Sequence, residues 1–120
     1  MPHVVVEISH PPFGHEHTFA GLYVATACLS KGMDVIVVLR GDGVYTGMRG
    51  QVDPQKNISL PATEAQIEDI LELDGTVVAD AGALVMRGIE SDELIEGIQV
   101  RESSDIHALI LKEGEKIIAF

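Results

Sequence analysis

The sequence has one cysteine, few basic residues and no long apolar run, and each shortage excludes a class of protein. A single cysteine among 120 residues cannot form an internal disulfide, so a reduced thiol in the cytoplasm is the default expectation. Eight Lys and Arg stand against 19 Asp and Glu, and the resulting net charge of −11 would repel nucleic-acid phosphates. No apolar run approaches the ~20 residues of a membrane span. Residues 1–4 lack the start of a signal peptide, so none is expected.

Apolar residues are plentiful instead. They make up 46% of the chain, and the mean hydropathy is +0.21. At this length we expect one domain spanning residues 1–120 with a core rich in Val and Ile. The same content favours an apolar surface shared between subunits, so an oligomer is expected as well.

The apolar residues are densest at positions 33–40, which run without polar alternation. This pattern is typical of a parallel strand covered on both faces. The strand is followed by Gly41-Asp42-Gly43, where glycine permits a sharp turn into a loop. Ligands of open α/β sheets bind beyond the carboxyl ends of strands. Residues 41–47 are therefore the first place to expect a site.

Periodicity and turn residues predict the other elements. Further strands are expected at residues 3–9, 76–79, 98–100 and 116–120, and helices at residues 15–31, 61–74, within 80–89, and from 103 or 104 to 114. Together they predict a three-layer α/β sandwich of flavodoxin-like type, with a five-stranded, mostly parallel sheet and helices on both faces.

Helix details follow from spacing. Glycines at positions 32 and 88 are expected to end the first and third helices. Predicted caps are a Thr63/Gln66 capping box, Ser91, and Ser103 or Ser104. One face of the first helix is expected to be buried: Phe19, Leu22, Tyr23, Thr26 and Leu29.

Three histidines gather after the first strand: His10, His15 and His17. Imidazoles on a loop can bind a divalent metal. In a helix, however, His15 and His17 would point roughly 200° apart, and beyond Glu16 no Cys or second carboxylate lies at motif spacing. Solvated residues at a helix start are the simpler interpretation, and a metal site is the alternative.

Loops at the carboxyl ends of the strands supply the candidate binding residues. Free N–H groups at the start of the first helix, near Phe13 and Gly14, can hold an anion, although no nucleotide-binding glycine motif is present. Asp42 and Tyr45 follow the second strand and Asp80 follows the third, with Arg87 near the same edge. Asp42 also fits an Asx turn and Asp80 a helix N-cap, and neither role excludes a site.

Cys28 is the lone thiol, late in the first helix. Reactive cysteines lie at helix N-termini or beside cations, so Cys28 is at the wrong end of its helix. A small buried hydrophobe is the simpler role.

Several segments taken in order resemble the DsrE/DsrF-like sulfur-relay family, which includes TusD- and TusC-like chains. The most specific are Gly41–Tyr45 and Ala83–Ile89. The others are 10–14, 19–22, 31–35 and 116–120, so the resemblance covers essentially the whole chain.

This resemblance implies a small α/β subunit that forms trimers, or hexamers with related chains. Members of the TusD/DsrE branch carry sulfur as a persulfide on one cysteine and exchange it with a TusA-like carrier. In this sequence the matching position, counted back from Gly88, is Asp80. A carboxylate cannot replace a sulfur nucleophile.

We therefore expect a cofactor-free sulfur-relay-type subunit that lacks the persulfide cysteine and acts in binding or assembly. Its expected pocket for a small anion or sulfur species comprises Phe13, Gly14, Asp42, Gly43, Tyr45 and Asp80. Two alternatives remain open: a sulfurtransferase that uses Cys28, and a metal- or small-ligand-binding module that uses the three histidines.

Overall fold

The structure, a computed structural model, describes residues 3–13, 16–50 and 62–120. Its strands are β1 (His3–Ile8), β2 (Asp34–Leu39), β3 (Thr76–Asp80), β4 (Gln99–Arg101) and β5 (Lys116–Ala119). The α-helices are α1 (His17–Ser30), α3 (Thr63–Glu72), α4 (Ala81–Met86) and α5 (Ser103–Glu113). Two 3₁₀ helices, η1 (Gly41–Gly47) and η2 (Ser91–Glu93), lie between them. Predicted and observed strands agree to within about two residues at their ends.

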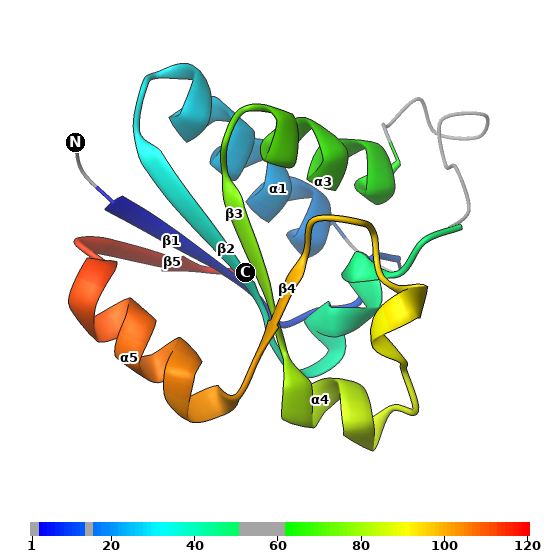
Figure 1. Cartoon of the computed structure of the whole chain (residues 1–120). Coiled ribbons are helices and arrows are strands. Elements are labelled where there is room, and N and C mark those ends of the chain that lie inside the picture. The colour runs from blue at the N-terminus through cyan, green and yellow to red at the C-terminus, as the bar shows by residue number, and fades with distance from the viewer. Residues whose placement is uncertain (1–2, 14–15, 51–61) are drawn as a thin grey trace.

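The five strands form one sheet in the order β4-β3-β2-β1-β5, and every strand pairing found among the described residues is parallel. Helices α1 and α3 cover one face of the sheet and α5 covers the other (Figure 1). Along the chain, β2, β3 and β4 each lie beside the strand before them, always on the same side. The connection from β4 to β5 runs the other way, so β5 lies on the opposite side of β1. Right-handed crossovers then place α5 on the opposite face. The predicted three-layer α/β fold is confirmed.

Alternate residues of the strands belong to two apolar clusters, one on each face of the sheet. Val35, Val37 and Leu39 of β2 join the cluster under α1 and α3, whereas Ile36 and Val38 join the cluster under α5. All five are at most 6% exposed. This two-sided burial is why the sequence of β2 shows no polar alternation.

The predicted buried face of α1 is wrong only in part, because Leu22 is buried and Phe19, Thr26 and Leu29 are half-buried. The buried residues are Thr18, Gly21, Leu22 and Ala25, whereas Tyr23 is 64% exposed. The helix is apolar on most sides, so spacing alone does not select the face that packs. The close approach of α1 to the sheet at Gly21 determines the buried face instead. A Cβ on Gly21 would lie 2.4 Å from Cδ1 of Ile8, so only a small residue fits there.

The predicted side-chain caps are also wrong. Thr63, Ser91 and Ser103 are each the first residue of a helix, and the N-cap is the residue before. The one capping box seen in the described residues pairs Glu90 with Glu93 at η2. The Ser103 side chain makes a tertiary contact instead of capping its own helix, as described below.

The predicted glycine ends of the first and third helices are confirmed. Gly32 (φ 83°) and Gly88 (φ 67°) have left-handed conformations, and Asp74 (φ 68°) follows α3. The expected start of α3 at Pro61 lies outside the described residues. Within the part of the chain that the structure describes, no helix is long and apolar enough to cross a membrane.

Candidate functional site

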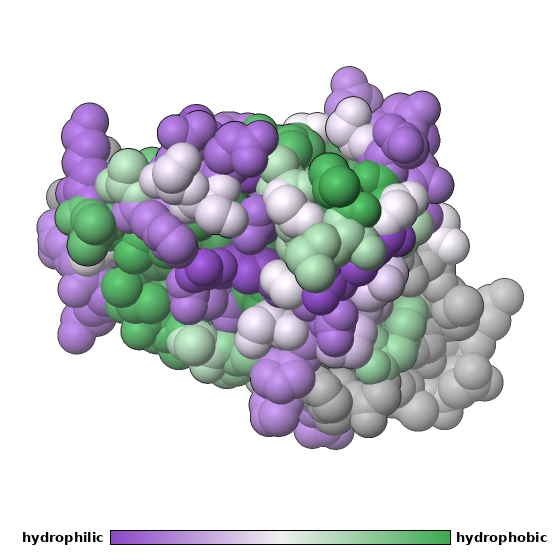
Figure 2. Space-filling model, turned by 90° about the horizontal axis from the view of Figure 1, so that it is seen from below, coloured by the Kyte–Doolittle hydropathy of each residue, from purple (hydrophilic) through white to green (hydrophobic). Residues whose placement is uncertain are grey.

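The carboxyl ends of β1 to β4 meet at one edge of the sheet, seen from below in Figure 2. There η1 follows β2, α4 follows β3 and α5 follows β4. Three polar side-chain groups hold these segments together. Each joins residues from different elements, so the edge is a connected surface rather than separate loops.

The first group links η1 to α4. Arg87 places both Nε and Nη2 3.0 Å from Oδ1 of Asp42, and its Nη1 donates to the carbonyl oxygen of Ala83 at 3.1 Å. The Asp42 side chain is 57% exposed, so this ion pair orients the two segments more than it stabilises the fold. Both residues were expected at this edge, and the structure brings them into contact.

The second group centres on Asp80, the last residue of β3. Its Oδ1 accepts a hydrogen bond from the Gly82 N–H at 3.0 Å, so Asp80 is the N-cap of α4. The Ser103 hydroxyl lies 3.0 Å from both Asp80 oxygens and donates to this carboxylate. Asp80 therefore ties the start of α4 to the start of α5.

The third group was not predicted. Arg40, just after β2, donates from Nη1 to Oε1 of Glu7 at 3.1 Å, and its Nη2 lies 2.9 Å from Nε2 of His107. A guanidinium group only donates, so Nε2 of His107 is the acceptor in this contact. Ser103 and His107 are four residues apart on α5 and share a face. That spacing was the one signal in the sequence that both side chains reach the carboxyl edge of the sheet.

The predicted loop after β2 is the 3₁₀ helix η1, packed tightly against the end of β1. Gly43 and Val44 are buried, Tyr45 is half-buried against the core and Asp42 is exposed. A Cβ on Gly43 would lie 1.9 Å from the carbonyl oxygen of Ile8, so the close approach requires glycine. Of the other predicted ligand residues, Phe13 is 39% exposed, and Gly14 lies outside the described residues.

The DsrE/DsrF-like family model matches residues 3–120, and therefore all the elements that build this edge. The chain belongs to the DsrE/DsrF-like family. Uncharacterized proteins of Methanopyrus kandleri (MK0008) and Methanocaldococcus jannaschii (MJ0989) are 29% and 27% identical to it. The first match covers 98% of this chain and 93% of the relative, and the second covers 96% of each.

Solved structures show the same fold. The ychN protein from E. coli has a TM-score of 0.88 at 23% identity, and MTH1491 from Methanobacterium thermoautotrophicum has 0.79 at 17%. Both matches cover 100% of each chain. This DsrE/DsrF-like chain therefore keeps the whole architecture of these proteins.

The thiol of this family member lies far from the site. Helix α1 runs back across the sheet, so Cys28, near its end, lies beside the start of β2, where its carbonyl oxygen accepts from the Met33 N–H. The side chain is half-buried against the core. Cys28 and Asp80 are thus at opposite ends of the parallel strands.

Two of the three predicted histidines meet. The ring centroids of His10 and His17 are 4.6 Å apart, whereas His15 lies outside the described residues. Across the ranges that the structure describes, no group of three or more His, Cys, Asp or Glu side chains is arranged to hold a metal ion.

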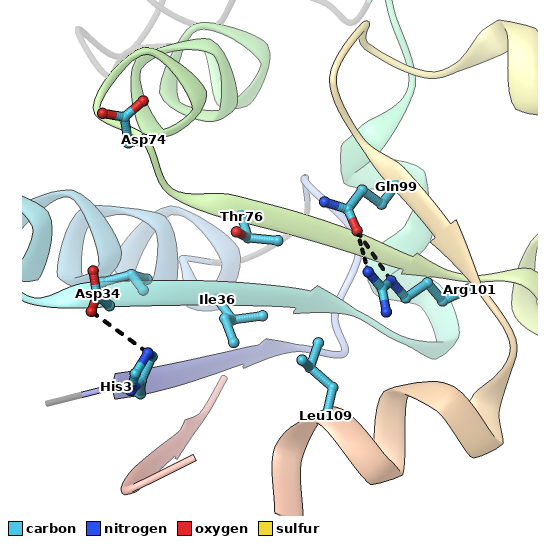
Figure 3. Close-up of a pocket in the computed structure, with 9 residues that line it drawn as sticks. His3, Asp34, Ile36, Asp74, Thr76, Gln99, Arg101 and Leu109 are labelled. Carbon is cyan, nitrogen blue, oxygen red and sulfur yellow. Dashed lines mark hydrogen bonds and ion pairs between the residues drawn. The ribbon is translucent and has the colours of Figure 1, made fainter. Parts of the chain in front are cut away.

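A groove of about 370 Å³ lies elsewhere, on the α5 face of the sheet (Figure 3). Ile36 and Thr76 lie on its floor, between Leu109 of α5 and Arg101 of β4. Arg101 is oriented by Gln99, whose Oε1 accepts from Nε at 3.1 Å and Nη2 at 2.9 Å. The sequence did not predict this groove, because the strip of sheet left open depends on where α5 packs.

The contact between Ser103 and Asp80 has a measurable consequence. Ser103→Ala removes a hydrogen bond to a half-buried carboxylate, and we expect it to lower the free energy of unfolding by about 1–2 kcal/mol. Ser104→Ala is the matched control, since this neighbour is exposed and a change within about 0.5 kcal/mol is expected. Urea denaturation of both variants measures the difference, and equal midpoints would mean that the Ser103 contact contributes nothing.

Proposed function

We propose that this chain is a sulfur-relay-type subunit that acts in binding and assembly and carries no persulfide itself. The observation that carries the proposal is the residue at the end of β3. From the resemblance to the family, the sulfur-carrying cysteine is expected there. This chain has Asp80 instead, whose carboxylate already accepts hydrogen bonds from Gly82 and Ser103. A carboxylate offers no sulfur nucleophile for a persulfide.

The position of Cys28 also supports the proposal that this chain carries no persulfide. A persulfide carrier must present its thiolate to a donor and to an acceptor. Cys28 is half-buried in the later part of α1, at the far end of the strands from Asp80. The alternative, a sulfurtransferase that uses Cys28, requires this thiol to load and unload sulfur from that position.

The proposed ligand is a small anion or a sulfur species held at the carboxyl edge. The residues proposed to line its pocket are Phe13, Gly14, Asp42, Gly43, Tyr45 and Asp80. Two features support this placement: ligands of parallel sheets bind at this edge, and Arg87 joins Asp42 to the helix that follows Asp80. The proposed partners are further copies of this chain or related subunits in a trimer or hexamer, and a TusA-like sulfur carrier, all in the cytoplasm.

Intact-mass spectrometry after incubation with a persulfide donor tests the proposal. We expect the wild-type protein to keep its mass while a cysteine-based carrier treated in parallel gains sulfur. Cys28→Ala is the matched variant and should behave like the wild type. A gain of one sulfur atom in the wild type that disappears in Cys28→Ala would refute the proposal and make Cys28 a carrier.

A further inference from the structure

Strand β5 leaves an apolar edge of the sheet open. It is the last strand in the sheet order, and among the described strands it pairs with β1 alone. Ile117 is 52% exposed and Ile118 37%. Their registers with Val5 and Val6 place them on opposite faces of the sheet, Ile117 with α5 and Ile118 with α1. Leu111 of α5 is 87% exposed. Figure 2 shows hydrophobic surface on the left, the side where Figure 1 places α5 and β5.

The backbone of β5 is equally open on its outer side. The Phe120 N–H donates to the carbonyl oxygen of Glu7, and the Phe120 carbonyl oxygen accepts from the Ser9 N–H, both toward β1. Because alternate residues of a strand direct their backbone groups to the same side, Lys116 and Ile118 direct theirs toward β1 like Phe120, and Ile117 and Ala119 direct theirs outward. Such an edge is a template for another strand unless charges, proline or a bulge block it, and Lys116 is the one charged residue of β5.

Charge favours this edge for contact between copies of the chain. With a net charge of −11, two copies repel each other over most of their surface. Residues 114–120 carry one lysine, Lys116, against one glutamate, Glu115, and are neutral overall. Two copies can therefore approach at β5 without local repulsion.

We propose that β5 pairs with β5 of a second copy in antiparallel fashion about a twofold axis, joining the two five-stranded sheets into one. On the axis, Ile117 of each copy exchanges backbone hydrogen bonds with Ile117 of the other, and Lys116 lies opposite Ile118 of the other copy. The register centred on Lys116 would oppose like charges, which destabilises a sheet. In the chosen register Ile118 packs on the aliphatic stem of Lys116 from the other copy.

This inference deepens the assembly part of the proposed function and rests on that part alone. Its test measures disulfide crosslinking and the molecular mass in solution, not the loading of sulfur. The crosslink and the persulfide experiment can therefore fail independently of one another.

The test places a cysteine on the proposed axis. In a Cys28→Ser background, Ile117→Cys is expected to form a disulfide-linked dimer under mild oxidation, because opposed residues of a hydrogen-bonded antiparallel pair have Cα atoms about 5.5 Å apart, within the usual range of a disulfide. The matched control is Met86→Cys in the same background, at a residue of α4 that is 84% exposed, and it should stay unlinked. By light scattering, the wild type should have at least twice the mass of one chain, and Ile118→Lys should lower that mass.

Three results would overturn the proposal: no crosslink in Ile117→Cys, equal crosslinking in Met86→Cys, or a wild-type mass of a single chain. The last result would also be expected if the natural occupant of this edge were a strand of a different protein.

Discussion

Gly43→Ala is expected to lower the free energy of unfolding by about 3 kcal/mol or more. The new Cβ would lie 1.9 Å from the carbonyl oxygen of Ile8 and 2.7 Å from its carbonyl carbon. Both are backbone atoms, and the same oxygen accepts a hydrogen bond from the Arg40 N–H at 3.0 Å, so neither can move without disturbing the end of β1. The midpoint of urea unfolding measures the effect.

Gly82→Ala is the control for this substitution at the same edge. Its Cβ would meet Oδ1 of Asp80 at 3.6 Å, an ordinary contact, and the residue lies in α4. Alanine is favoured over glycine in a helix by up to about 1 kcal/mol, so we expect unchanged or slightly higher stability. If the two variants unfold at the same urea concentration, η1 does not approach β1 as closely as described.

If the proposed function holds, Asp80→Cys in a Cys28→Ser background is expected to create a persulfide carrier. The substitution puts a thiol at the end of β3, at the N-cap of α4, where the adjacent N–H group of Gly82 favours a thiolate. The expected result is a gain of one sulfur atom by intact mass after incubation with a persulfide donor, and its loss on reduction. Removing the cap costs about 1 kcal/mol, so folding is confirmed first by circular dichroism.

Asp42→Cys in the same background is the control, because position 42 lies at the same edge and its side chain is well exposed. We expect the thiol at position 80 to load faster than the one at position 42. Equal rates would show that any exposed thiol reacts with the donor, and failure of Asp80→Cys to load would show that this edge does not support the family's chemistry.

Much of the fold was predictable because burial determines which positions of a strand are apolar, and this pattern can be seen in the sequence. The unbroken apolar run at residues 35–39 indicated a strand covered on both faces, and β2 is that strand. The face of α1 was not predictable from spacing, since that helix is apolar on most sides. Gly21 and Ala25 pack inward because the sheet and Phe120 come close to that side.

The candidate site was predictable in part. The position of Asp80 after a strand and before a helix indicated an N-cap at the carboxyl edge, and the structure confirms that role. The partners of the edge residues could not be predicted. Ser103 looked like a cap for its own helix, yet its hydroxyl donates to Asp80. Arg40 gave no sign that it would bridge Glu7 and His107.

The sequence by itself determined the elements, their order, the parallel sheet and the absence of a second thiol, because periodicity, turn residues and composition are local properties. The tertiary structure decided which side chains meet: Asp42 with Arg87, Asp80 with Ser103, and Arg40 with Glu7 and His107. It also decided that Cys28 lies at the far end of the strands from Asp80 and that β5 is an exposed edge. These features depend on how helices cross the sheet and in which order the strands lie side by side, which local spacing does not encode.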